Sequence, residues 1–113
     1  MIAVLKTIGG YDYMEIVKSL NGTELTLVVK GKIDTKSTPE LEEALDGALD
    51  GITKLIFDFK DVIYITSAGL RALLAAQTTM DDVNGEMIIR YVNEEVKEVF
   101  DVTGFSKFLT LES

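Results

Sequence analysis

The stretch Asp61–Gln77, DVIYITSAGLRALLAAQ, joins an apolar run to a segment rich in alanine and leucine. Two hydroxyl residues, Thr66 and Ser67, stand side by side at the join. The apolar run predicts a strand, and the segment after it predicts a helix from about Ala68 to about Met80. The first backbone N–H groups of a helix lack partners, so a Ser or Thr there is commonly only a cap, worth about 1 kcal/mol. A chemical role for the hydroxyl needs further support.

The composition is that of an ordinary globular domain. The chain has 113 residues, of which 47% are hydrophobic and 27% are charged, which suits one domain with one core. No apolar run approaches the roughly 18 residues that cross a bilayer. The opening MIAVLK is too short for a secretory signal. We therefore expect a cytoplasmic protein.

The residue types that are missing exclude several chemistries. The chain contains no cysteine and no histidine, so it has no thiolate, no imidazole base and no Ser-His-Asp or Cys-His site. Ile65 also takes the place of the first glycine that a nucleophile elbow around Ser67 would need. The net charge of −8 opposes binding to nucleic acid or to anionic membranes. The sequence predicts a protein-binding module that is not an enzyme and has no cofactor and no metal site.

Periodicity gives the order of the elements. Two β-rich runs flank Asn21-Gly22, which predicts a hairpin with a type I′ turn. The segment 37–51, STPELEEALDGALDG, has the period of a helix that starts at Ser37 or Thr38 and ends at Gly51. The segments that follow predict a strand, the helix after Ser67, a strand, a helix and a weak last segment: 54–59, 68–80, 86–92, 94–104 and 105–111.

This alternation predicts an α/β domain. We expect a mixed β-sheet that begins with the hairpin, is partly parallel, and has the helices packed on it. Residues 1–11 are expected to form an N-terminal extension or an extra strand, and residues 12–111 the domain itself. Asp58 and Asp61 lie close enough in the chain to suggest Mg²⁺, but such pairs are commonly solvated.

Three features around Ser67 go beyond a helix cap. No Glu or Gln follows at the position that closes a capping box. Ala68 and Gly69 are small, so a partner's backbone could come close to the hydroxyl. Arg71 lies in the first turn, where a cation opposes the helix dipole unless an anion is nearby. A phosphate on Ser67 would supply that anion at a helix N-terminus.

At this point the sequence resembles a known family. The segment 63–74, IYITSAGLRALL, is similar to the phosphorylation-site motif of STAS domains, specifically the anti-sigma factor antagonists of bacterial partner-switching systems. The segment 28–45 resembles the Gly-x-apolar-Asp turn of the family, and the segment 99–111 resembles its Thr-Gly-apolar ending. The resemblance implies that Ser67 is the phosphoacceptor. The preceding position is often Asp in the family, and here Thr66 is a rival acceptor.

The resemblance also implies partners. An unphosphorylated antagonist binds an anti-sigma factor that is usually also a serine protein kinase, and phosphorylation breaks the complex until a PP2C-type phosphatase reverses it. Asp34 is either a plain turn former or part of the partner surface beside the phosphoacceptor. The expected partner-binding residues are Asp34, Thr66, Ser67, Ala68, Gly69 and Arg71. The alternative is a non-switching STAS module, such as a stress-sensing scaffold or a soluble transporter subunit, with Ser67 as a cap.

Overall fold

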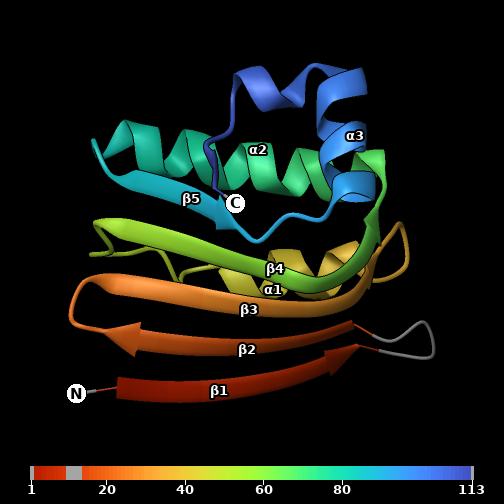
Figure 1. Cartoon of the computed structure of the whole chain (residues 1–113). Helices are drawn as coiled ribbons and strands as arrows, with labels where there is room; N and C mark the ends of the chain where they lie inside the picture. The colour runs from red at the N-terminus through yellow and green to blue at the C-terminus, as the bar shows by residue number, and fades with distance from the viewer. Residues whose placement is uncertain (1, 10–13, 113) are drawn as a thin grey trace.

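A six-stranded sheet forms the frame of the part of the chain that the computed structural model describes, residues 2–9 and 14–112 (Figure 1). The strands follow their order in the sequence across the sheet. The first three pair antiparallel, and from the third strand onward the pairing is parallel. Their bounds are β1 Ile2–Gly9, β2 Met14–Asn21, β3 Glu24–Ile33, β4 Lys54–Ile65, β5 Glu86–Arg90 and β6 Leu111–Glu112. The predicted α/β fold, with its mixed sheet and N-terminal hairpin, is confirmed.

A helix lies in each parallel connection, because two parallel strands must be joined by a crossover. The helices are α1 Thr38–Leu45, α2 Ser67–Asp82 and α3 Glu94–Thr103, followed by the short 3-10 helix η1 Phe105–Lys107. Helix α1 packs beside α2, α2 packs on β4 and β5, and α3 packs on β4. None of the helices in the described residues is both long enough and apolar enough to cross a membrane.

The core lies between the sheet and the helices. Along β3 every second residue is buried, so one face of the strand points into the protein. The largest fully buried side chains come from the sheet and from all three helices: Met14, Ile16, Leu27, Ile33, Leu41, Leu55, Phe57, Phe59, Leu70, Leu73, Met80 and Phe100. Helix α2 therefore sits on a packed apolar layer, which fixes the position of its first turn.

Two local predictions are wrong. Asn21 pairs with Glu24, so Gly22 and Thr23 are the central residues of the hairpin turn. Gly22 has φ of +63°, whereas Thr23 is not among the residues with positive φ, so the turn is of type II′; the predicted type I′ turn at Asn21-Gly22 would need positive φ at both central residues. The first helix ends at Leu45, well before the predicted Gly51, and the chain continues in turns.

The start of α1 decides between the two predicted caps. Ser37 is the N-cap residue, followed by Thr38 and Pro39 in the first turn. The Ser37 side chain makes no capping hydrogen bond to the helix. Its hydroxyl instead donates to the Lys32 carbonyl at 2.7 Å and accepts from the Asp34 N–H at 2.9 Å. The hydroxyl therefore holds the turn before the helix rather than the helix itself.

The carboxyl end of β4 is irregular, and this irregularity positions the site. The pairing of β4 with β3 shifts register between Val28 and Lys30 and again between Gly31 and Lys32. Extra residues on one strand bend it and increase its twist. Figure 1 shows the end of β4 curving out of the sheet toward the start of α2 and the side of α3.

The expected boundary between residues 1–11 and 12–111 lies outside the described residues. The structure places Ile2–Gly9 in β1, paired with β2 along its whole length.

Candidate functional site

The junction of β4 and α2 is closed by backbone hydrogen bonds. Thr66 is the N-cap residue, with extended φ and ψ of −101° and 175°, and the helix begins at Ser67. The Thr66 N–H donates to the Ile33 carbonyl at 2.9 Å, which ties this junction to the end of β3. The Leu70 N–H donates to the Thr66 carbonyl at 3.0 Å and closes the first turn. The predicted helix is confirmed, and it extends slightly beyond both predicted ends.

The two neighbouring hydroxyls differ in access. The Thr66 Oγ1 atom is buried, and among the described residues it has no hydrogen-bond partner. It makes no capping hydrogen bond either, so the ordinary explanation for a hydroxyl at a helix start does not hold for Thr66. Ser67 is exposed, at the first position of the helix. A macromolecule in solution can reach the side chain of Ser67, whereas the Thr66 oxygen is closed off.

The small residues after Ser67 serve different purposes. Gly69 is buried, and a Cβ atom placed on it would lie 2.6 Å from Ile33 Cγ2 and 2.7 Å from Ile65 Cγ1. The space beside Gly69 is therefore filled by the protein itself, and the expected part of Gly69 in partner binding stays a prediction. Ala68 is half-buried, and Arg71 is exposed one turn after Ser67. These two residues stay with Ser67 on the accessible side of the helix start.

Asp34 organises the neighbouring turn. Its Oδ1 atom accepts the backbone N–H groups of Lys36 at 2.9 Å and Ser37 at 3.0 Å. Its own carbonyl accepts the Thr38 hydroxyl at 2.6 Å. Hydrogen bonding from the Ser37 N–H, more than any other cause, lowers the pKa of the Asp34 carboxyl from its usual 3.8. The predicted turn-forming role of Asp34 is confirmed.

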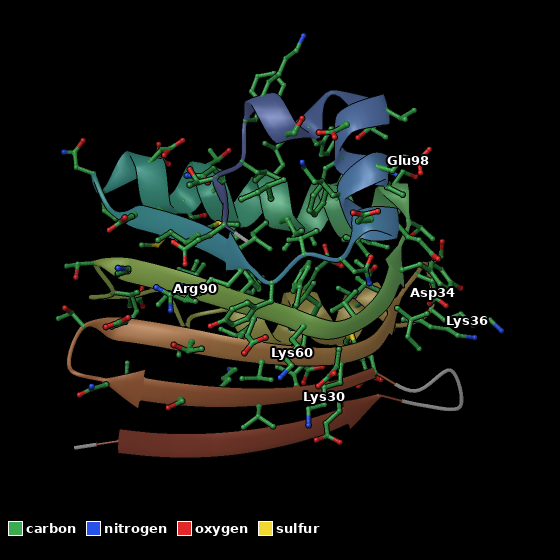
Figure 2. All side chains as sticks on the ribbon, viewed as in Figure 1. Lys30, Asp34, Lys36, Lys60, Arg90 and Glu98 are labelled. Atoms are coloured by element: carbon green, nitrogen blue, oxygen red, sulfur yellow. The ribbon has the colours of Figure 1, made fainter. Side chains whose placement is uncertain are left out.

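The turn and the helix start are neighbours in space. Asp34 directly follows Ile33, whose carbonyl binds the Thr66 N–H. Figure 2 shows Asp34 and Lys36 at the same edge of the molecule as Glu98 of α3. The structure thus brings Asp34, Thr66 and Ser67 together at the carboxyl ends of β3 and β4, where open α/β sheets usually bind their ligands.

Helix α3 completes this edge; the sequence predicted the helix itself but not its place beside the site. Asn93 caps α3 by accepting the Val96 N–H at 2.8 Å, and its Nδ2 donates to the Val62 carbonyl at 2.8 Å. This pair of bonds holds the start of α3 against the curved end of β4. An Asn directly before two glutamates is a typical helix start, so the cap could have been predicted. The contact with β4 could not, because it joins residues far apart in the sequence.

The site has the chemistry of a recognition surface. In the described residues no group of three or more acidic side chains is arranged to hold a metal ion. The spacing of Asp58 and Asp61 in the sequence suggested a possible Mg²⁺ pair. In the structure the Oδ1 atom of Asp58 accepts the Lys60 N–H at 3.0 Å. The site presents an exposed serine, a helix N-terminus, an arginine and a rigid acidic turn.

The family model of the STAS domain matches residues 14–113. The chain belongs to the STAS domain family. A protein of Bordetella bronchiseptica, BtrV, which carries the name of an anti-sigma factor antagonist, is 30% identical to this STAS domain over 82 residues, 72% of this chain and 71% of that protein. The resemblance that the three sequence segments indicated is therefore confirmed. The match to the family model begins at Met14, after β1.

Solved structures share the fold of this STAS domain. The crystal structure of an anti-sigma factor antagonist from Mycobacterium paratuberculosis superposes with a TM-score of 0.78 at 23% identity, covering 92% of this chain and 89% of that one. The Bacillus cell fate determinant SpoIIAA in its phosphorylated form gives a TM-score of 0.66 at 14% identity, covering 98% and 92%.

Proposed function

We propose that this STAS domain is an anti-sigma factor antagonist whose binding is switched by phosphorylation of Ser67. The observation that carries the proposal is the contrast between two adjacent hydroxyls. Ser67 is exposed at the first position of α2, whereas the Thr66 oxygen is buried. The names of the relatives supply the class of partner, an anti-sigma factor.

The host structure can accept a phosphate at this position. The phosphoryl group adds about −1.5 to −2 charges and three acceptor oxygens. At the start of α2 it meets the unpaired backbone N–H groups and the positive end of the helix dipole. Arg71, four residues on in the same helix, provides a cation on the neighbouring turn. The fold of the antagonist therefore stays intact when Ser67 is modified.

A bound partner cannot accept the same group. When the anti-sigma factor covers Ser67, a new dianion lies in the interface without water. Burying an unpaired charge costs several kcal/mol, and each 1.4 kcal/mol lowers the affinity tenfold. The unphosphorylated form therefore binds, and the phosphorylated form is released.

The remaining parts of the switch lie in other proteins. The anti-sigma factor is also the serine protein kinase that modifies Ser67, and a PP2C-type phosphatase restores the serine. All of them act in the cytoplasm. The antagonist itself is a substrate rather than an enzyme, because it has no histidine or cysteine that could activate the serine.

Mass spectrometry after incubation with the cognate anti-sigma factor and ATP tests the proposal. The wild-type chain and the matched variant Thr66→Val gain one phosphate at the same rate, and Ser67→Ala gains none. Equal phosphorylation of Ser67→Ala would exclude Ser67 as the acceptor. Binding of the cognate anti-sigma factor with no phosphorylation of the wild-type chain would instead identify a non-switching STAS module.

A further inference from the structure

A shallow groove runs beside the junction of β4 and α2, between the curved end of β4 and α3. Its volume is about 440 Å³. The lining residues come from β4 and from one side of α3: Tyr64, Glu95, Glu98, Val99, Val102 and Thr103. Tyr64 is the second-last residue of β4 and lies three positions before Ser67. The groove and Ser67 therefore share one edge of the molecule.

The walls of the groove leave apolar surface in contact with solvent. Helix α3 buries Val96 and Phe100 in the core, which accounts for its inner side. Val102 is 79% exposed, and Tyr64 is 37% exposed across the groove from it. Single exposed apolar residues are common, but several along one hollow are typical of a surface that another molecule covers.

The charges at the groove have one sign. Glu95 and Glu98 are both exposed, and among the described residues that line the groove there is no Lys or Arg. Lys32 is not part of the lining, and its Nζ lies 5.9 Å from the centre of the Tyr64 ring. A partner that fits must bring an apolar side chain for the floor and basic side chains for the rim.

We propose that this groove is a second part of the docking surface for the anti-sigma factor, and that it receives an apolar side chain flanked by Lys or Arg. This inference rests on the proposed function, because the occupant is the same protein that covers Ser67. The groove lies on β4 and α3, so a phosphate on α2 leaves its shape unchanged. It therefore supplies affinity in both states, while Ser67 supplies the switch.

Substitution at Val102 tests the groove without disturbing the core. Val102→Asp places a charge on the apolar wall beside two glutamates, and we expect the affinity for the cognate anti-sigma factor to fall at least tenfold in isothermal titration calorimetry. Glu98→Lys should weaken binding as well, by a factor that shrinks as salt is added. The matched control is Val83→Asp at the end of α2, where Val83 is 60% exposed and lies outside the groove. It should bind like the wild type.

The phosphorylation reaction gives a second measurement. A residue that only docks the kinase contributes equally to substrate and transition-state binding, so its loss raises KM and leaves kcat unchanged. We expect this pattern for Val102→Asp. Thermal melts of Val102→Asp and of the control Val83→Asp, followed by circular dichroism, show whether weaker binding comes from lost docking or from lost folding.

The outcomes keep the two proposals apart. If Val102→Asp and Glu98→Lys bind like the wild type while Ser67→Glu binds weakly, the groove proposal is overturned and the Ser67 switch stands. If no anti-sigma factor binds the wild-type chain, both proposals fall. If Val102→Asp changes only self-association, measured by sedimentation, the groove belongs to an interface between two copies and the proposal is likewise overturned.

Discussion

A negative charge at Ser67 should stabilise the free protein, and this can be tested without any partner. Ser67 is the first residue of the 16-residue helix α2, and no acidic residue occupies the first turn of that helix. A carboxylate near a helix N-terminus contributes about 0.3–1 kcal/mol. An acid placed four residues before Arg71 adds about 0.2–0.5 kcal/mol. Ser67→Glu should therefore raise the free energy of unfolding by about 0.5–1.5 kcal/mol relative to a neutral residue of the same shape.

The matched neutral variant is Ser67→Gln, which has the size and helix propensity of Glu without the charge. Urea unfolding of the two variants at pH 7 gives the difference directly, provided that both transitions have the same slope. Raising the salt to about 1 M shortens the screening length to about 3 Å, so most of the difference should disappear. Adding Arg71→Ala to both the Ser67→Glu and the Ser67→Gln variant should remove the smaller part of the difference in unfolding free energy, the part that comes from the pair with Arg71.

One result would refute the reasoning. If Ser67→Glu were less stable than Ser67→Gln at low salt, the surroundings of Ser67 would repel an anion. Phosphorylation would then damage the antagonist itself, and release of the partner would follow from unfolding rather than from charge in the interface. A difference that does not respond to salt would also contradict an electrostatic origin.

Three further predictions follow from the contacts around the site. Gly69→Ala gains about 1 kcal/mol of helix propensity but forces a Cβ atom against Ile33 and Ile65, so urea unfolding should show a net loss of up to about 2 kcal/mol, and a net gain would contradict the tight contact. Thr66→Val replaces a buried hydroxyl that lacks a partner among the described residues, so it should be neutral or stabilising in thermal melts; a loss above about 1 kcal/mol would reveal a hydrogen bond at that oxygen. Asp34→Ala should cost about 1–2 kcal/mol at pH 7, because two backbone N–H groups lose their acceptor. Since the pKa of Asp34 is lowered in the folded state, the stability that its charge provides is complete above about pH 4 and is lost as the pH falls through the folded pKa, so the difference from wild type should shrink there; a difference that is constant with pH would exclude the charge as its source.

The sequence predicts most of the fold because its periodicities are clear, and it fails where two arrangements fit the same pattern. The buried residues of β2 include Met14 and Ile16, and those of β3 include Leu27 and Val29. A turn at Asn21-Gly22 would pair Ile16 with Leu27, whereas the observed turn pairs it with Val29. Both registers place apolar residues on the same face, since they differ by two positions. Alternation therefore cannot choose between them, and the turn geometry decides.

The early end of α1 has a similar cause. The segment after Leu45 keeps a helical spacing of apolar residues, but the backbone at Asp46 is extended and Gly47 has φ of +70°. Leu49 packs against the core from a turn instead of a helix. A spacing of three and four residues is compatible with either conformation when the segment is this short, so pattern alone predicts too long a helix.

The sequence predicted the candidate site as one motif, but each of its residues is fixed by a different physical constraint. Gly69 is required because α2 starts so close to the ends of β3 and β4 that Ile33 and Ile65 leave no room for a side chain. The Thr66 oxygen is buried at the same junction, and Ser67 is the exposed hydroxyl of the pair. A larger residue at position 69 would lift the helix start and could uncover Thr66. We therefore expect that Gly69→Ala, in addition to lowering stability, lets the kinase modify Thr66 to a measurable extent, which peptide mass spectrometry would detect. Phosphate found on Ser67 alone in that variant would show that recognition by the kinase, rather than burial, selects the acceptor.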